Sequence, residues 1–67
     1  MKMIKVESSN IEAIGWENKQ LNITFNSGST YVYLDVPEKI FDDMLEAESV
    51  GKYFHANIRG VYDYDQL

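Results

Sequence analysis

The sequence predicts one small α+β domain, in which an antiparallel β-meander of three to five strands carries two short helices on one face. Three observations lead to this prediction. The chain has 67 residues, enough for a single domain. Its first half alternates apolar and polar side chains with a period of two, and its second half shows helical spacing. Short polar turns separate the strand-like segments, which favours an antiparallel meander in the order β-β-β-α-α-β.

The strands are expected in the following places. Residues 6–8 predict a short edge strand, and residues 11–16 predict the first long strand. Residues 20–25 alternate three apolar side chains with polar ones, so that one face is apolar. Residues 30–35 predict a third strand that is rich in β-branched and aromatic side chains. Polar turns are expected at residues 8–10, 17–19 and 26–29.

The first helix is expected to follow this third strand. Asp35 is the predicted N-cap, Pro37 lies in the first turn, and Glu38 has the spacing of a capping box. The second helix is expected to begin at Ser49 and to run to about residue 57, with Gly60 ending it before a last strand at residues 61–64. The predicted core comprises Ile11, Ile14, Leu21, Ile23, Phe25, Val32, Leu34, Ile40, Phe41, Leu45, Val50, Phe54 and Ile58.

Composition and charge exclude several classes of function. The formal net charge of −5 opposes broad affinity for nucleic acid, although it does not exclude a local basic site. The chain has no cysteine, no apolar run of membrane-spanning length and no signal-peptide pattern, so we expect a cytoplasmic protein. His55, the only histidine, has no second histidine or cysteine as a catalytic or metal partner. We therefore expect no enzyme activity, no cofactor and no metal site.

An ordered set of short motifs resembles the KTSC domain family. The motifs are Ser8-Ser9-Asn10-Ile11, Ala13-Ile14-Gly15-Trp16, residues 21–28, Tyr31-Val32-Tyr33, Val36-Pro37, residues 47–54 and residues 58–62. They cover nearly the whole chain, with Trp16 where the family is expected to have tyrosine and His55 where it is expected to have asparagine. The family takes its name from the C terminus of some lysyl-tRNA synthetases and also occurs as free-standing bacterial and phage proteins. The resemblance implies a function in RNA binding, by analogy with the synthetases.

The third strand carries the first candidate site. Tyr31 and Tyr33 point to one side, and Val32 and Leu34 point to the other. If the helices cover Val32 and Leu34, the tyrosines form an exposed row that can stack nucleobases, joined by Trp16, Tyr62 and Tyr64. In the alternative interpretation both faces are covered and the tyrosines pack inside. An uncovered aromatic face would also favour a homodimer.

The start of the second helix is the second candidate site. Ser49 caps the helix, Gly51 allows close approach to the backbone, and Lys52 lies in the first turn, where an anion would be favoured. Arg59 follows seven residues later. A phosphate or carboxylate held by the amides of residues 51 and 52 with Lys52 and Arg59 is one interpretation. In the other, Lys52 is simply solvated and Arg59 pairs with Asp63 or Asp65.

These sites predict a small non-catalytic binding module. The first hypothesis is an accessory RNA-binding domain that uses the tyrosines with Lys52, Arg59 and Tyr62. The alternative is an acidic protein-interaction module, or a phage-type inhibitor, that binds a basic partner protein. Its acidic surface would be formed by Glu38, Asp42, Asp43, Glu46 and Glu48.

Overall fold

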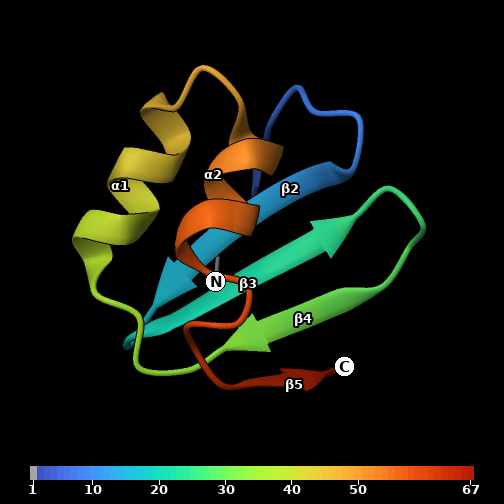
Figure 1. Ribbon diagram of the computed structural model, residues 1–67. Coiled ribbons are helices and arrows are strands. Elements are labelled where there is room, and N and C mark those ends of the chain that lie inside the picture. The colour runs from blue at the N-terminus through green and yellow to red at the C-terminus, as the bar shows by residue number, and fades with distance from the viewer. Residues whose placement is uncertain (1) are drawn as a thin grey trace.

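The computed structural model describes residues 2–67 and contains a five-stranded antiparallel sheet and two helices. In Figure 1 both helices lie on the same face of the sheet. In the chain they come after the fourth strand and before the fifth. The predicted α+β class and the antiparallel meander are therefore confirmed. The strands follow one another in the sheet in chain order, and the elements are β1 (Ile4–Lys5), β2 (Ile11–Glu17), β3 (Gln20–Phe25), β4 (Thr30–Tyr33), α1 (Glu38–Glu46), α2 (Val50–Asn57) and β5 (Tyr64–Gln66).

The two central hairpins depend on residues with positive φ. Asn18 and Lys19 have φ of 51° and 62°, and they connect the paired residues Glu17 and Gln20. Two central residues with positive φ make a turn whose twist matches that of the flanking strands. The second hairpin closes where the amide of Phe25 donates to the carbonyl of Ser29 over 2.8 Å, with Gly28 at a φ of 97°. These turns set the register of β2, β3 and β4.

The register places the tyrosines of β4 under the helices. Leu21 pairs with Tyr33 and Ile23 pairs with Tyr31, so the tyrosines share a face with the apolar residues of β3. Tyr33 is only 4% exposed and belongs to the core, and Tyr31 is half-buried beside it. Of the two interpretations, the structure matches the one in which the tyrosines pack inside, as Tyr33 does, and the exposed row on the face away from the helices is wrong. Both faces of β4 are apolar, and pairing with the strongly alternating β3 decides which one turns inward.

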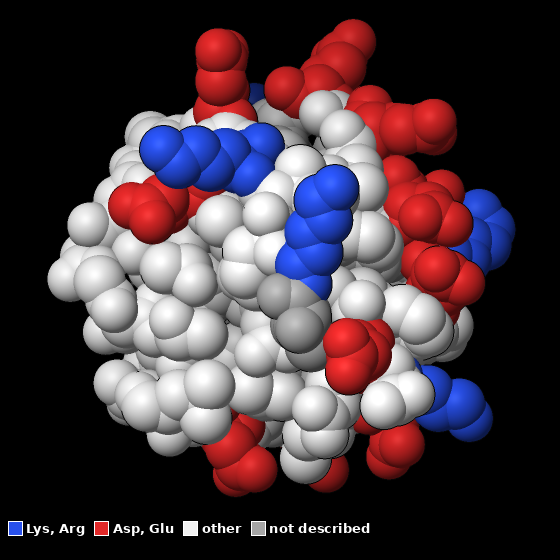
Figure 2. All heavy atoms as spheres, turned by 180° about the vertical axis from the view of Figure 1, so that it is seen from behind, with Lys and Arg blue, Asp and Glu red and all other residues white. Residues whose placement is uncertain are grey.

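The opposite face of the sheet is mostly uncharged. Val32 pairs with Asn22, and Thr30 pairs with Thr24, whose hydroxyl lies 3.0 Å from the hydroxyl of Thr30. Figure 2, which views the molecule from behind, shows uncharged atoms over much of this surface, two basic side chains across its upper half and acidic side chains mainly around its margins. This face therefore offers neither an aromatic row nor a concentrated charge.

Helix α1 begins slightly later than its capping motif predicts. Its N-cap is Pro37, which makes no side-chain capping hydrogen bond, and Asp35 instead has a φ of 56°. The prediction of Asp35 as N-cap is wrong, because the chain needs a left-handed residue to leave β4. Met44 is the only fully buried side chain of α1, and Ile40, Phe41 and Leu45 are half-buried.

Helix α2 packs more deeply. The hydroxyl of Ser49 accepts a hydrogen bond from the amide of Lys52 over 3.2 Å, which confirms the predicted cap. Val50, Phe54 and Ile58 are buried, as predicted. The observed core differs from the predicted one by including Ala13, Tyr33, Val36 and Met44, and by leaving Phe25, Leu34, Ile40, Phe41 and Leu45 only half-buried.

Both terminal strands are displaced from their predicted positions. The strand predicted at residues 6–8 lies at Ile4–Lys5, and the strand predicted at residues 61–64 lies at Tyr64–Gln66. The chain after α2 first makes a turn in which the amides of Val61 and Tyr62 both donate to the carbonyl of Ile58. Neither helix of residues 2–67 is long and apolar enough to cross a membrane.

Candidate functional site

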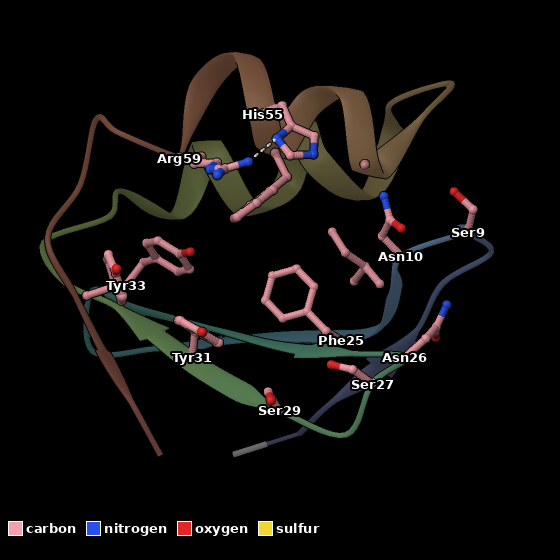
Figure 3. Close-up of a pocket in the computed structure, with 14 residues that line it drawn as sticks. Ser9, Asn10, Phe25, Asn26, Ser27, Ser29, Tyr31, Tyr33, His55 and Arg59 are labelled. Carbon is pink, nitrogen blue, oxygen red and sulfur yellow. Dashed lines mark hydrogen bonds between the residues drawn. The ribbon is translucent and has the colours of Figure 1, made fainter.

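A cleft of about 590 Å³ opens between α2 and the helix-covered face of β3, β4 and β5. Figure 3 shows α2 above it and the strands below. Three kinds of side chain line three parts of its wall: aromatic rings on the floor, hydroxyl and amide groups at the loop end, and His55 of α2 with Arg59, which directly follows the C-cap of that helix. None of the lining residues is acidic, although the chain as a whole is.

The floor of the cleft is a cluster of five aromatic rings. Strands β3, β4 and β5 contribute Phe25, Tyr31, Tyr33 and Tyr64, and α2 contributes Phe54. The rings of Tyr31 and Tyr33 are nearly parallel, with an interplanar angle of 20° and centroids 6.5 Å apart. Phe54 makes edge-to-face contacts with Phe25 at 5.5 Å and with Tyr33 at 5.6 Å. Such edge-to-face geometries are favourable between aromatic quadrupoles, so these rings stabilise one another within the floor.

Tyr64 is the most accessible ring of the floor. Its centroid lies 5.4 Å from the rings of both Tyr31 and Tyr33, yet 55% of its surface is exposed. Tyr33, by contrast, is buried, and its burial affects the pKa of its phenol. Burial, with smaller contributions from Tyr64 and Tyr31, raises the pKa of Tyr33 above 10.0, and the charge of Arg59 partly opposes this. Tyr33 therefore remains a neutral phenol at physiological pH, within the influence of the guanidinium.

Hydrogen bonds between two loops hold the polar end of the cleft. The hydroxyl of Ser8 accepts from the amides of Asn10 and Ile11 at 3.2 and 3.3 Å. The side-chain amide of Asn26 donates to the carbonyl of Ser8 over 3.2 Å, and its backbone amide donates to the carbonyl of Asn10 over 2.8 Å. The loop between β1 and β2 is thus tied to the hairpin turn after β3. This arrangement leaves the hydroxyls of Ser9, Ser27 and Ser29 along the cleft.

The cationic wall consists of two residues one helical turn apart. Arg59 Nη1 lies 3.4 Å from His55 Nδ1, drawn as a dashed line in Figure 3. Because a guanidinium can only donate, this contact is a hydrogen bond only when the Nδ1 atom accepts. The predicted pairing of Arg59 with Asp63 or Asp65 is not what the structure shows.

The predicted anion site at the start of α2 is only partly assembled. The amide of Lys52 is already bonded to Ser49, and the Lys52 side chain does not line the cleft. Gly51 does line it, and a Cβ atom there would lie 3.4 Å from the hydroxyl of Ser8. Arg59, Gly51, Tyr31 and Tyr33 line the same cleft, whereas Lys52 and Ser49 do not line it.

Two further predicted rings lie elsewhere. The indole of Trp16 donates to the carbonyl of Val36 over 2.8 Å, and the ring packs against the hydrophobic core. Tyr62 is half-buried and packs against the core without lining the cleft. Sequence reasoning did not include His55, Phe25 and Phe54 among the site residues. The spacing of Gly51, His55 and Arg59 at every fourth position is the one signal that they share a side of α2.

Within residues 2–67, no group of three or more histidine or acidic side chains is placed to hold a metal ion. The cleft also has no carboxylate near His55 that would form an acid–base pair. What the cleft can do chemically is bind a flat group on its aromatic floor and a negative charge at Arg59.

Comparison with known proteins gives a family, relatives of similar sequence and a similar solved structure. The pattern that defines the KTSC domain matches residues 7–62. A protein of Tsukamurella paurometabola is 42% identical over 59 residues, which cover 85% of this chain and 88% of that protein. A lysine–tRNA ligase of Nostoc is 39% identical over 67 residues, which cover 97% of this chain but only 12% of the ligase.

The fold agrees with the sequence relationship. The crystal structure of a KTSC domain protein from Yersinia pestis superposes on 98% of this chain and 96% of its own, with a TM-score of 0.95 at 34% identity. The predicted resemblance is therefore confirmed, and the same domain occurs both alone and within a ligase. This chain belongs to the KTSC domain family.

Proposed function

We propose that this domain is a non-catalytic RNA-binding module that holds an unpaired nucleotide in the cleft between α2 and the sheet. The observation that carries the proposal is the composition of the cleft. Five aromatic rings form its floor, Arg59 lies on its wall, and no acidic side chain lines it. A nucleotide combines the two features that such a cleft can recognise, a flat base and an anionic phosphate.

The parts of the cleft have complementary roles in this proposal. A base stacks on the accessible ring of Tyr64 and on Tyr31, and the guanidinium of Arg59 contacts the phosphate. The serine hydroxyls and the side chains of Asn10 and Asn26 offer hydrogen bonds to the edge of the base. The base must be unpaired, because its face and its edge are both engaged.

The relatives support RNA as the polymer. Lysine–tRNA ligases from Nostoc contain a domain similar to this chain, and those enzymes act on a transfer RNA, as their name states. The ligase as a whole is much longer than this chain, so its catalytic activity is not part of the proposal. The absence of a carboxylate beside His55 supports a binding role over an acid–base role.

The acidic net charge is compatible with this proposal because no acidic side chain lines the cleft, although Asp63 and Asp65 flank Tyr64 in the chain. Residues Glu38, Asp42 and Glu46 lie exposed on α1, whereas α2 carries Lys52 and His55 and no acid. Repulsion between α1 and RNA is screened within about 10 Å at moderate salt. We therefore expect weak, selective binding with few phosphate contacts.

A titration with short single-stranded RNA at low ionic strength tests the proposal. Replacing Tyr64→Ala should weaken binding roughly 5- to 150-fold, since stacking contributes about 1–3 kcal/mol per base. Tyr64 is mostly exposed, so the variant should fold normally. Replacing Arg59→Ala should weaken binding and flatten the salt dependence, by about 0.7 in slope for each phosphate that the variant no longer neutralises.

Two matched variants serve as controls. Lys52→Ala removes a cation from the same helix outside the cleft, and Tyr62→Ala removes a tyrosine outside it. Both should bind RNA like the unchanged protein. Failure of single-stranded RNA and transfer RNA to bind at low salt would eliminate the proposal. The acidic surface of α1, facing a basic partner protein, would then be the better candidate.

A further inference from the structure

We infer that His55 and Arg59 act as one phosphate-binding pair at the wall of the cleft, and that His55 takes up a proton when the phosphate binds. The inference rests on the proposed function, because it specifies where the phosphate of the bound nucleotide lies. It adds His55 to the binding residues and makes RNA affinity depend on pH.

The geometry of the pair leaves it ready for an anion. Arg59 follows His55 by four residues, and the Nη1 atom of its guanidinium lies 3.4 Å from the Nδ1 atom of the imidazole. Among residues 2–67, Arg59 makes no ion pair with a carboxylate, so most of its donors remain available to a ligand. The ring of His55 is exposed, and its centroid is held 5.4 Å from the ring of Phe54.

Electrostatics determine the direction of the proton linkage. Without an anion, a second positive charge 3.4 Å from the guanidinium is opposed by Coulomb repulsion. A phosphate between the two residues supplies the compensating charge, and a protonated imidazole can donate to it instead of accepting from Arg59. The pair also lies at the C-terminal end of α2, where the helix carbonyls favour cations. A proton should therefore accompany the phosphate.

Few other groups face His55. On α2 and its end, the charged side chains nearest to it in the chain are Lys52, three residues earlier, and Arg59, of which only Arg59 contacts the imidazole. Across the cleft, β4 presents Tyr31 and Tyr33 and β5 presents Tyr64, and the loops present only uncharged side chains. Imidazole is the only side chain type in this set that ordinarily changes charge between about pH 5 and pH 8.

The test compares the affinity for a short oligouridylate at about pH 5 and about pH 8, the range in which an imidazole titrates. Uracil does not protonate in this range, so the RNA does not contribute. Affinity should rise as the pH falls, by up to about tenfold per pH unit while one proton is taken up. Calorimetry in two buffers of different protonation enthalpy should detect that proton directly. Equal affinity at both pH values, with no proton uptake, would overturn the inference.

Substitutions at His55 separate a proton-binding role from a structural one. His55→Gln keeps an acceptor for Arg59 but cannot titrate, so it should bind with the same affinity at both pH values. His55→Lys carries a permanent charge and should bind at about pH 8 as tightly as the unchanged protein binds at about pH 5. The matched control Lys52→Ala should retain the pH dependence. Loss of the pH dependence in that control, or its persistence in His55→Gln, would contradict the inference.

The kind of phosphate that the pair binds is tested separately. Affinities of oligonucleotides with and without a 5′-phosphate, compared at a single pH, show whether the pair binds a terminal phosphate or an internal phosphodiester. The pH series uses the oligonucleotide without a 5′-phosphate, because a terminal phosphate itself titrates at about pH 6. Absence of RNA binding at both pH values would overturn the proposed function and this inference with it. Binding without pH dependence would overturn the inference alone.

Discussion

The two helices pack on the same face of one sheet, yet they differ in charge and in burial. Helix α1 carries four acids and one lysine and buries only Met44, whereas α2 carries no acid and buries Val50 and Phe54. In Figure 2 acidic side chains gather on the side of the molecule where α1 lies. The net charge of −5 therefore conceals a local difference: α1 is acidic, whereas α2 has no acidic residue and borders a cleft that no acidic side chain lines.

Removing the main anchor of each helix should produce the largest effects. Phe54→Ala should lower the free energy of unfolding by about 3–5 kcal/mol, and Met44→Ala by about 2–5 kcal/mol. Only the change in α2 should also damage the cleft, because Phe54 contacts Phe25 and Tyr33. Urea unfolding measures the destabilisation of both variants. The milder Phe54→Leu should fold and bind RNA weakly, and an equal decrease of affinity in folded Met44→Ala would contradict the distinction.

Reversing the charge of α1 should have the next largest effect. The triple substitution Asp42→Lys, Asp43→Lys and Glu46→Lys should raise RNA affinity on the order of tenfold at low salt, since it removes repulsion without touching the cleft. The gain should disappear as salt screens the charges. Unchanged affinity at low salt would show that α1 does not influence the cleft. If α1 instead binds a basic protein, the same variant should lose that partner.

The buried phenol of the cleft should make the fold sensitive to alkali. Because the pKa of Tyr33 is raised above 10.0 in the folded state, its neutral form stabilises the fold fully below that pH. This contribution is lost as the pH rises through the folded pKa, where the buried phenol must ionise or be exposed. Unfolding measured in a series of buffers above about pH 10 should show the loss, and Tyr33→Phe should reduce it. The more exposed Tyr64, changed in Tyr64→Phe, provides the control ring.

The ion pair of α1 should contribute least. Lys39 Nζ lies 3.0 Å from Asp43 Oδ2 in an exposed i, i+4 arrangement, and this contact raises the pKa of Lys39. Exposed pairs of this kind contribute little, because water and salt screen them. Asp43→Asn should leave the unfolding midpoint almost unchanged, with a small decrease seen only at low salt. A large decrease would mean that α1 depends on its charges more than on Met44.

The candidate site was harder to predict than the fold. The strand limits of β3 and the cap of α2 by Ser49 follow from local pattern and were predicted correctly. The sequence leaves two interpretations of the tyrosines of β4 open, because each face of that strand looks equally apolar in isolation, and only the pairing with β3 decides between them. Asp35 was misassigned for a related reason: its capping pattern is local, but the departure of the chain from β4 required a positive φ.

Sequence alone determined the elements whose information is local: alternation in β3, the polar turns, the helix start at Ser49 and the family motifs. Tertiary structure decided which side of β4 faces the helices, that Tyr64 rather than Tyr62 joins the cleft, and that Arg59 meets His55 instead of an acid. The physical reason is that register, burial and charge partners depend on residues far apart in the chain. The sequence pattern of one strand or one helix does not specify which other residues pack against it.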